Sequence, residues 1–587
     1  MNPERAETEK EISDTTSTVL NELRMEQKLC DVVIKTEDVE FKAHKIILSS
    51  CSLYFRTLFC GAWATDKLVY SIPGVSPEIM SHIISYAYTS SVPLTDQNVK
   101  QVLEAADQFL IPGLVQDCCV YLENKLCLRN CMTTWRVLDF FNCTESRKKV
   151  FHYVLKHFEE IVEVSEEFLE LSENLLGLII QDDHLSVRNE RVVFEAVLRW
   201  INHLPEERRG CMAVLLAKVR LGLMNESYLV YDVFANALIQ QNPECTPIVH
   251  DASAAFTDFL SNRHSDTIYS NPLSRPRMPP SILLVTGGKN VLDPAVELEA
   301  YDSRADRWVT FGSIGAHRAH HGAAVLNNCV YLIGGCNSEG YLNTVQKIHL
   351  PSFTSMDVAS LNSRRSSVSV AVLGGLIYAM GGHNRHPQRS VECYHPELDR
   401  WIMAAPMHSK RTGAGATTFN GKIYVCGGTN GNYSASTAEC YNPETNTWTM
   451  IAPMRVARAG LGVAAYQGRI YAIGGVVNHT NTCEAYDPQT NRWSRVPSMF
   501  NRRSYFGIEV VDDQLFAVAG YNGTNTLLTV ERYDENAGMW FSAAPLEAPR
   551  SGLSCCVLPG LHELTTQLFP RPPLKSSTVE EAAGGHN

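Results

Sequence analysis

The side chains best able to hold a metal ion or attack a substrate are 18 cysteines and 19 histidines. The densest run of cysteines, over residues 118–143, has no Cys-x-x-Cys pair and no histidine at zinc-finger distance. Five histidines of the C-terminal half also lack a fixed metal-ligand spacing: His320, His321, His383, His386 and His479. We therefore expect neither a metal nor another cofactor.

Acid–base catalysis would need a histidine and a carboxylate arranged around a nucleophile. His44 and Asp31 are the candidates near the N-terminus. No pattern in the sequence places a serine or cysteine nucleophile, or a second base, with these two residues. We therefore expect both side chains to hold the local fold together, and we expect no catalytic residues.

Length and charge narrow the class of protein. The 587 residues predict two to four domains, and the net charge is −12. Residues 281–560 are nearly neutral, with 22 basic and 21 acidic side chains, so neither part has the basic excess of a nucleic-acid binder. No apolar run approaches a membrane span, no secretory signal is present, and the scattered cysteines fit a reducing compartment. We expect a cytoplasmic protein with no membrane partner.

Residues 21–126 predict a mixed α/β domain. A β-rich run over 29–34 has a candidate hairpin partner over 39–41, and from Ala43 the apolar residues recur at helical spacing. Five motifs in this block resemble the BTB/POZ domain in order and spacing: Cys30-Asp31-Val32-Val33, Phe41-Lys42-Ala43-His44-Lys45, Ser52-Leu53-Tyr54-Phe55, Tyr86-Ala87-Tyr88-Thr89 and Ala105-Ala106-Asp107-Gln108-Phe109.

The BTB resemblance implies a symmetric homodimer and a docking groove for cullin-3. The cullin-binding side chains that it implies are Tyr54, Phe55, Trp63 and Asp66. Cullin-binding relatives carry an apolar residue, any residue and then Glu in the loop after the first long helix. Here Thr65 stands where that Glu is expected. Two alternatives stay open: Asp66 replaces the Glu or the contact is lost, and Trp63 anchors a partner or packs on its own domain.

Residues 127–247 are patterned almost wholly as amphipathic helices. The stretches VFEAVLRWI and LLAKVRLGLM resemble the BACK domain, which follows BTB in kelch-like proteins. Polar and proline-bearing residues predict a linker over 248–280. We expect a flexible N-terminus over 1–20 and a disordered tail over 561–587.

The C-terminal half repeats one pattern six times. Short apolar strands run into pairs of small residues that start 47, 47, 46, 47 and 45 residues apart: Gly287-Gly288, Gly334-Gly335, Gly381-Gly382, Gly427-Gly428, Gly474-Gly475 and Ala519-Gly520. A period of this length is typical of propeller blades. Five repeats continue with a Glu-x-Tyr element and then a tryptophan: Trp308, Trp401, Trp448, Trp493 and Trp540. The combination resembles the kelch repeat.

Two repeats are unusual. In the second, Gln346 replaces the Glu, Ile348 replaces the Tyr, and no tryptophan lies near Met356. We therefore expect the blade to be retained but to pack less tightly against its neighbours. The first repeat lacks an upstream strand, whereas residues 550–558 have no glycine pair after them. We predict that this last segment completes the first blade and closes a six-bladed ring over 281–560.

One rim of the propeller is the expected binding surface. Kelch propellers of this family receive a protein ligand there, through residues after each glycine pair and after a repeated arginine. The arginines are expected to brace blades: Arg318, Arg365, Arg411, Arg458, Arg503 and Arg550. The substrate-binding residues that the resemblance implies are Lys289, His320, Ser366, His383, Arg385, Thr412, Asn430, His479, Ser504, Tyr505, Tyr521, Asn522 and Ser551.

The expected fold class is a multidomain chain: an α/β BTB domain, an all-α BACK domain and an all-β six-bladed kelch propeller. The resemblance implies a non-catalytic adaptor of a cullin-3 RING ubiquitin ligase, which binds cullin-3 through BTB and BACK and a substrate protein through the propeller. The alternative is a cytoskeletal, actin-type scaffold that recruits no ligase. The missing zinc-finger and basic motifs disfavour a transcriptional BTB protein, and the histidine spacing disfavours a kelch copper oxidase.

Overall fold

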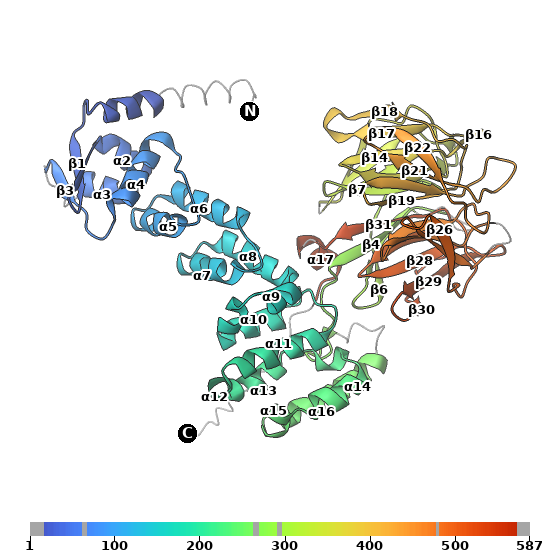
Figure 1. Cartoon of the computed structure of the whole chain (residues 1–587), viewed down its shortest axis with the longest axis horizontal. Helices are drawn as coiled ribbons and strands as arrows, with labels where there is room; N and C mark the ends of the chain where they lie inside the picture. The colour runs from blue at the N-terminus through green and yellow to red at the C-terminus, as the bar shows by residue number, and fades with distance from the viewer. Residues whose placement is uncertain are drawn as a thin grey trace, which may run out of the picture. The chain divides into compact units, whose positions relative to one another are not determined.

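The computed structural model describes residues 17–61, 67–261, 269–289, 296–350, 352–476, 480–560 and 562–571 (Figure 1). Contacts divide the chain into two compact units: residues 1–179 with 198–206, and residues 180–197 with 207–587. The division falls inside the segment predicted as the helical domain. Within the described ranges, every helix is too short or too polar to cross a bilayer.

A small sheet and several helices begin the first unit. Strand β1 (Val32–Thr36) pairs antiparallel with β2 (Val39–Ala43) and parallel with β3 (Val69–Ser71). The predicted hairpin is confirmed, with Ile34 opposite Phe41. Residues 17–25 are helical, and the helices that follow are α2 (Lys45–Cys51), α3 (Leu53–Cys60), α4 (Pro77–Thr89), α5 (Val99–Gln108) and α6 (Pro112–Asn124).

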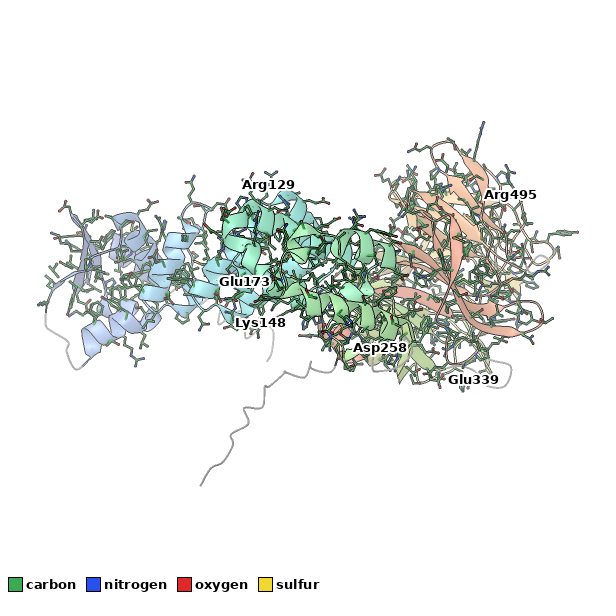
Figure 2. The ribbon with its side chains drawn as sticks, turned by 90° about the horizontal axis from the view of Figure 1, so that it is seen from below. Arg129, Lys148, Glu173, Asp258, Glu339 and Arg495 are labelled. Atoms are coloured by element: carbon green, nitrogen blue, oxygen red, sulfur yellow. The ribbon has the colours of Figure 1, made fainter. Side chains whose placement is uncertain are left out.

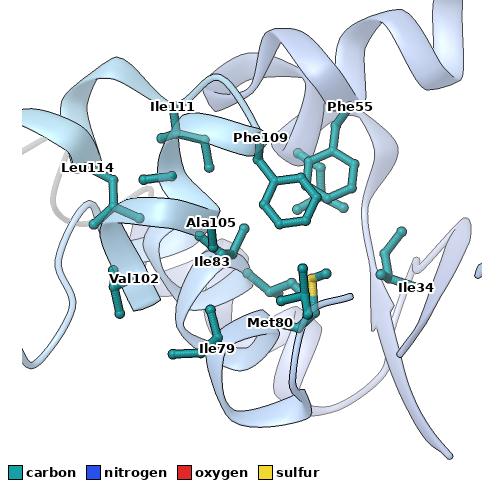
Figure 3. Packing of buried hydrophobic residues seen from close by; sticks show 14 of the residues in the cluster. Ile34, Phe55, Ile79, Met80, Ile83, Val102, Ala105, Phe109, Ile111 and Leu114 are labelled. Carbon is teal, nitrogen blue, oxygen red and sulfur yellow. The ribbon is translucent and has the colours of Figure 1, made fainter. Parts of the chain in front are cut away.

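Apolar side chains of these helices pack against β1 to form one core (Figure 3). Ile34, Phe55 and Phe109 are fully buried, and the two phenylalanine rings stack with their centroids 5.3 Å apart. Burial of each such side chain contributes about 1.5–3 kcal/mol to folding. The helical spacing of apolar residues after Ala43 is therefore explained by this core.

His44 and Asp31 have structural roles, as predicted. The Nδ1 atom of His44 lies 2.6 Å from the Tyr88 hydroxyl oxygen, and its Nε2 atom lies 3.0 Å from the Lys28 carbonyl oxygen. Asp31 accepts a hydrogen bond of 2.7 Å from the backbone N–H of Lys45, at the start of α2. The carboxylate thus satisfies a free amide at a helix N-terminus.

The middle of the chain is helical throughout its described residues. The 3-10 segments are η1 (Glu167–Glu170), η2 (Arg209–Cys211) and η3 (Leu221–Leu223), and η4 (Leu229–Val233) is a π-helix. The α-helices are α7 (Cys131–Phe140), α8 (Thr144–Lys156), α9 (Phe158–Val164), α10 (Glu173–Gln181), α11 (Glu190–His203), α12 (Pro205–Arg208), α13 (Met212–Leu216), α14 (Glu226–Tyr228), α15 (Ala237–Gln240) and α16 (Cys245–Ser261).

Part of the predicted linker is ordered and buried. Helix α16 occupies its first half, and the last part is tied to the second unit by buried arginines. Arg275 Nε lies 2.9 Å from Asp183 Oδ1, and Arg277 Nη2 lies 2.9 Å from Glu190 Oε2. Paired charges of this kind tolerate burial, which polar composition alone does not reveal.

The propeller consists of six four-stranded antiparallel sheets, numbered here as blades 1 to 6 (Figure 1). In order from the inner to the outer strand, blade 1 is β31 (Ser554–Pro559), β4 (Ser281–Thr286), β5 (Glu297–Asp302) and β6 (Arg307–Ser313). Blade 2 is β7 (Gly322–Leu326), β8 (Cys329–Ile333), β11 (Val345–His349) and β12 (Thr354–Val358). Blade 3 is β13 (Ser369–Leu373), β14 (Leu376–Met380), β17 (Val391–His395) and β18 (Arg400–Ala404).

The remaining blades have the same order of strands. Blade 4 is β19 (Gly415–Phe419), β20 (Lys422–Cys426), β21 (Ala438–Asn442) and β22 (Thr447–Ile451). Blade 5 is β23 (Gly462–Tyr466), β24 (Arg469–Ile473), β25 (Cys483–Asp487) and β26 (Arg492–Val496). Blade 6 is β27 (Gly507–Val511), β28 (Gln514–Tyr521), β29 (Thr526–Asp534) and β30 (Met539–Ala543). Short hairpins β9–β10 (Cys336–Asn337, Gly340–Tyr341) and β15–β16 (His383–Asn384, His386–Pro387) and a 3-10 turn η6 (Pro396–Leu398) complete the blades.

The predicted closure of the ring is confirmed. Strand β31 pairs with β4 from Ser554 opposite Thr286 to Pro559 opposite Ser281. The six inner strands pack against one another in a closed circle, in which β31 contacts both β27 and β7. Because the last strand completes the first blade, the circle has no open seam between its ends.

The repeated glycine pair joins each blade to the next. The amide of the second residue of each pair donates to the carbonyl oxygen of the arginine that enters the following blade, as in the 2.8 Å bond from Gly382 to Arg411. The first residue of each pair has a positive φ. It also lies close to the backbone of the following arginine, and a β-carbon at Gly381 would collide with the Arg411 carbonyl oxygen. The bond recurs at all six junctions, including that from Gly520 to Arg550 at 2.9 Å.

The tryptophans also connect neighbouring blades. The indole N–H of each of the five donates to a backbone carbonyl at the end of the preceding blade, at 2.7–2.8 Å, as in the bond from Trp448 to Ala405. Blade 2 has no such bond, and Met356 is 60% exposed. This arrangement fits the expectation that the second blade is retained but packs less tightly against its neighbours.

A helix covers the seam that lacks a tryptophan. Helix α17 (His562–Leu568) buries Leu564 and Leu568 in one cluster with Ile348 of blade 2 and Leu284 of blade 1. Residues 562–571 belong to the segment that we expected to be a disordered tail. The difference has a physical cause, because the missing aromatic side chains leave apolar surface that the helix buries.

Candidate functional site

One end of the propeller, the upper face, carries the loops that follow the second strand and precede the first strand of each blade. At its centre six residues, each two positions after a repeated arginine, form a closed ring of backbone hydrogen bonds at 2.7–3.0 Å. The bonds run from Ser367 to His320, Gly413 to Ser367, Gly460 to Gly413, Tyr505 to Gly460, Gly552 to Tyr505 and His320 to Gly552. This ring surrounds the mouth of the central channel and holds the loops in fixed register.

Two bulky residues occupy strained positions in this ring. His320 and Tyr505 have φ values of +53° and +51°, a region of backbone conformation that favours glycine. Three other blades have a glycine at this position. Their rings meet edge to face with centroids 5.1 Å apart. Strained non-glycine residues of this kind concentrate at functional sites, so the pair marks the centre of the upper face as a candidate site.

A cavity of about 580 Å³ opens beside this aromatic pair. Five of the predicted substrate-binding residues line it together: Lys289, His320, Tyr505, Tyr521 and Ser551. Ser367 and Thr526 complete the lining and were missed by the sequence interpretation. Ser367 was detectable, because it stands at the same offset from Arg365 as Tyr505 does from Arg503.

The central cavity presents neutral aromatic groups and one cation. Burial and the neighbouring Lys289 lower the pKa of His320 to about 4, so the imidazole is neutral at physiological pH. Burial raises the pKa of Tyr505, whose hydroxyl stays protonated. Lys289 is exposed, so its charge is available to a ligand. The cavity can therefore stack, donate hydrogen bonds and neutralise one negative charge.

A second cavity of about 510 Å³ lies on the same face, between the loops of blades 2 and 3. Of the predicted residues, only Arg385 lines it. The residues that the sequence interpretation missed are Tyr341, Arg364, Asn384, His386 and Glu339, the last labelled in Figure 2. Two hairpins, β9–β10 and β15–β16, form this cavity, and each of their strands has two residues. Strands this short have no periodic pattern in the sequence.

The two cavities are connected by direct contacts. His383 and Ser366, both predicted, exchange backbone hydrogen bonds of 2.8 and 3.0 Å. The ring of His383 meets that of Tyr341 edge to face, with centroids 5.2 Å apart. His383 and Ser366 line neither cavity, but they fix the lining of the second cavity, through Tyr341, next to that of the central cavity, through Ser367.

The other predicted rim residues have local roles. Thr412 pairs through its backbone with Thr429, and the amide oxygen of Asn430 accepts from Tyr433 N at 2.9 Å. Ser504 is fully buried and donates to the Tyr521 carbonyl oxygen, and Asn522 shapes a turn by accepting from Asn525 N at 2.7 Å. His479 lies outside the described residues.

The repeated arginines are braces, as predicted. Arg365, Arg411, Arg458, Arg503 and Arg550 are each almost fully buried, and each pairs with a buried glutamate. Arg411 Nη2 lies 2.8 Å from Glu439 Oε1, and Glu439 also accepts from the backbone N–H of His408 at 2.7 Å. The exception is Arg318, which bonds the Gly334 carbonyl at 2.6 Å and has Gln346 at the glutamate position.

Below the ring, the central channel is a cavity of about 430 Å³. Its lining is mostly apolar or hydroxylic, and Glu509 is the one carboxylate among the lining residues. Burial raises the pKa of Glu509 to about 8. The side chain is therefore largely protonated at neutral pH in the folded state.

The Glu509 carboxyl predicts a pH-dependent effect on stability. The unfolded chain ionises this group near pH 4.5, whereas the folded chain does so near pH 8. Its contribution to stability is therefore complete below pH 4.5 and is lost as the pH rises to about 8. We expect Glu509→Gln to raise the propeller's Tm by about 3–6 °C at pH 8 and by almost nothing at pH 4.5, measured by calorimetry. An equal shift at both pH values, or the same shift in the exposed-turn control Glu444→Gln, would contradict this.

The first unit has its own surface feature, the apolar groove. It is a cavity of about 560 Å³, and Leu53 and Leu110 on its border are 57% and 51% exposed. The lining residues come from helices α3, α5, α6 and α8 and from the turn between α5 and α6: Leu53, Ala106, Asp107, Leu110, Ile111, Pro112, Val115, Gln116, Cys119, Cys143, Thr144, Glu145 and Ser146. Exposed leucines beside an apolar cavity are typical of a protein-docking surface.

The cullin-binding residues predicted from the sequence lie elsewhere or are outside the description. Phe55 is fully buried in the core, and Tyr54 is partly buried with its ring edge-on to Phe109. Both side chains face the core, because the motif that suggested them is dominated by aromatic core residues, and neither lines the apolar groove. Trp63 and Asp66 lie outside the described residues.

Among the described residues, no three His, Cys, Asp or Glu side chains are grouped so as to hold a metal ion.

Family models match successive parts of the chain. Residues 20–126 match the BTB/POZ domain, and residues 131–233 match "BTB And C-terminal Kelch". The kelch motif matches residues 317–362, and the FKB95 kelch-repeats domain matches residues 342–540. The three domain types thus occur in the predicted order.

Curated relatives carry the same family name. Human kelch-like protein 3 is 35% identical over 324 residues, 54% of each chain, so the match spans about half the length of that relative. Human kelch-like protein 28 is 31% identical over 375 residues, 62% of this chain and 65% of that protein. Human kelch-like protein 6 is 30% identical over 439 residues, 70% of this chain and 67% of that protein. With BTB, BACK and kelch regions in order, this chain belongs to the kelch-like family.

Proposed function

We propose that this chain is a substrate adaptor of a cullin-3 RING ubiquitin ligase. The observation that carries the proposal is the presence, in one kelch-like chain, of a BTB domain with an exposed apolar groove and a propeller with two cavities on one face. In this role the BTB and BACK regions bind cullin-3, and the upper face binds a substrate protein. The chain supplies no catalytic residue, and its effect on rate is proximity.

The proposal includes the setting in which the adaptor works. We infer a homodimer through the BTB domain, which adds avidity when two propellers engage one substrate, and a cytoplasmic location. Three stretches, NPLSRPRMPPSILLVTGG, FNRRSYFGIEVVDD and LSCCVLPGL, resemble kelch-like protein 10.

The apolar groove is the proposed cullin-docking surface. We expect the double change Leu53→Glu with Leu110→Glu to abolish co-purification of cullin-3 with the full chain, because it puts two charges where apolar contact is required. Circular dichroism should remain unchanged, since both side chains are more than half exposed. Phe140→Glu is the matched control, because Phe140 is 81% exposed and does not line the groove.

The same purification separates the adaptor from its alternative. Loss of cullin-3 in the groove variant, with the propeller's partners retained, supports the adaptor. Tyr505→Ala with Tyr521→Ala should show the reverse, with partners lost and cullin-3 retained. Absence of cullin-3 even from the unaltered chain would support an actin-type scaffold instead, which the threonine at position 65 favours.

A further inference from the structure

The upper face of the propeller is strongly basic. Seven exposed cations lie in its described loops: Lys289, Arg364, Arg385, Arg389, Lys410, Arg455 and Arg502. The exposed carboxylates of the same loops are Glu339 and Glu547. The six repeated arginines do not add to this surface charge, because they are buried as braces. This excess stands against a net charge of −12 for the chain.

The opposite end of the propeller has the reverse charge. The described turns that join the first strand to the second, and the third to the fourth, contain seven carboxylates: Asp306, Glu397, Asp399, Glu444, Asp512, Asp513 and Glu535. Arg304 is the cation of these turns. The exposed loop cations of the propeller are therefore concentrated at its upper face, whereas the carboxylates of the opposite turns lie beside basic residues that begin the strands there, such as Arg400 and Arg469.

The cations of the upper face lie at its cavities. Lys289 lines the central cavity, and Arg364 and Arg385 line the second cavity, where Glu339 is the opposing carboxylate. All three cations are exposed. His383 lies between the two linings, since its backbone bonds Ser366, next to Ser367 of the central cavity, and its ring contacts Tyr341 of the second cavity.

We propose that the upper face selects a peptide segment rich in aspartate and glutamate, with one carboxylate at Lys289 and another at the Arg364–Arg385 pair. This inference rests on the proposed function, because it names the chemical class of the substrate segment. Arginine donates paired hydrogen bonds that match a carboxylate, which makes the second cavity the more selective one. Between these ends, Asn384, Ser551 and the aromatic rings supply hydrogen bonds and stacking for the peptide backbone and apolar side chains.

A short acidic peptide fits this surface better than a nucleic acid. The cations are few and are separated by neutral hydrogen-bonding groups, whereas a nucleic acid requires a continuous row of phosphate contacts. The acidic remainder of the chain also repels a long polyanion, while a short segment feels mainly the charges within a Debye length of about 8–10 Å.

The test uses the full-length chain, immobilised and offered a library of random 12-residue peptides. We expect the retained peptides to be enriched in Asp and Glu over Lys and Arg, relative to the input. The most enriched peptide, labelled with fluorescein, should bind about 10-fold or more tightly than its copy with every Asp changed to Asn and Glu to Gln. A phosphorylated copy, with phosphoserine for each acidic residue, shows whether carboxylate or phosphate is preferred, and tighter phosphopeptide binding would overturn the carboxylate assignment.

Matched variants localise the effect. Lys289→Glu with Arg385→Glu should weaken binding of the labelled peptide by about 10- to 100-fold, whereas Arg400→Glu should change it less than about two-fold. Arg400 is exposed and begins β18 beside the acidic turns, so it carries the same charge change at the other end. Enrichment of neutral or basic peptides, equal binding of the amide copy, or stronger binding of single-stranded poly(U) at the same face would overturn the inference.

Co-purification of cullin-3 with the same variants keeps two failures apart. If cullin-3 is retained and the selected peptides are not acidic, the inference fails and the adaptor stands. If the peptides are acidic and cullin-3 is absent, the adaptor fails and the inference about the upper face stands.

Discussion

A chain that ends at Arg550 is expected to lose the propeller's cooperative unfolding transition. The deletion removes β31, the inner strand of blade 1, with Leu553, Cys556 and Leu558, which are all buried. Each buried apolar side chain contributes about 1.5–3 kcal/mol, and a whole domain is stable by only about 5–15 kcal/mol. The loss also leaves β4 with an unpaired edge. Calorimetry and limited proteolysis of the truncated chain measure the result.

Two longer chains serve as controls for the truncation. A chain that ends at Arg571 keeps β31 and α17 and should unfold like the full chain. A chain that ends at Gly560 keeps β31 but loses Leu564 and Leu568, so it should melt several degrees lower with one cooperative transition. If the chain that ends at Arg550 melted like the full chain, β31 would not close the ring.

Breaking one brace should have the second largest effect. Glu439→Gln keeps the shape of the side chain but leaves Arg411 buried without its counterion. Such uncompensated burial costs about 3–5 kcal/mol, so we expect a fall in the propeller's Tm of roughly 10 °C. Burial alone would raise the pKa of Glu439, but Arg411 and the His408 amide hold the pKa below its ordinary value. The pair therefore stays ionised throughout the neutral range.

The second blade provides the complementary change. Gln346→Glu places a carboxylate at the position where the other blades pair with their arginine, but it removes the hydrogen bonds that Gln346 Nε2 donates to the Ile314 carbonyl oxygen and to the Ser355 hydroxyl. Because the loss of these bonds offsets part of the new attraction to Arg318, we expect a net gain of about 1 kcal/mol or less, read as a slightly higher Tm. The exposed change Glu444→Gln should have almost no effect. A loss of stability in the Gln346→Glu chain would show that the bonds of the Gln346 amide outweigh any attraction between a carboxylate and Arg318.

Features fixed by the repeat were predictable from the sequence. The period specified six blades, the unmatched strand at the end specified the closure, and the regular arginines were correctly interpreted as braces. The central cavity was also found in large part, because Lys289, Tyr505 and Tyr521 stand at fixed offsets from the glycine pairs and arginines. Each of these positions is set by hydrogen bonds that recur from blade to blade.

Features that depend on a single local contact were not predictable. Tyr341 and His386 reach the second cavity through hairpins that occur in one blade each. Helix α17 is ordered because it covers the seam that lacks a tryptophan, and Arg275 is buried because Asp183 neutralises it. In the BTB domain, the aromatic residues of the motif pack in the core, whereas Leu53 and Leu110, which were not among the predicted cullin-binding residues, border the groove. Long-range pairing of this kind leaves no periodic signal in one sequence.

The closed ring of six backbone hydrogen bonds limits how this propeller can evolve. A repeat of 45–47 residues is easily duplicated or lost at the level of the gene, but an extra or missing blade would force the ring onto a different radius, where each of these bonds and each packed inner strand must be re-spaced. With the number of blades held constant, change in the sequence is then accommodated in the loops rather than in the number of repeats. Among the described ring residues, His320, Ser367 and Tyr505 stand where other blades have glycine, so the ring keeps its backbone bonds while its side chains differ from blade to blade.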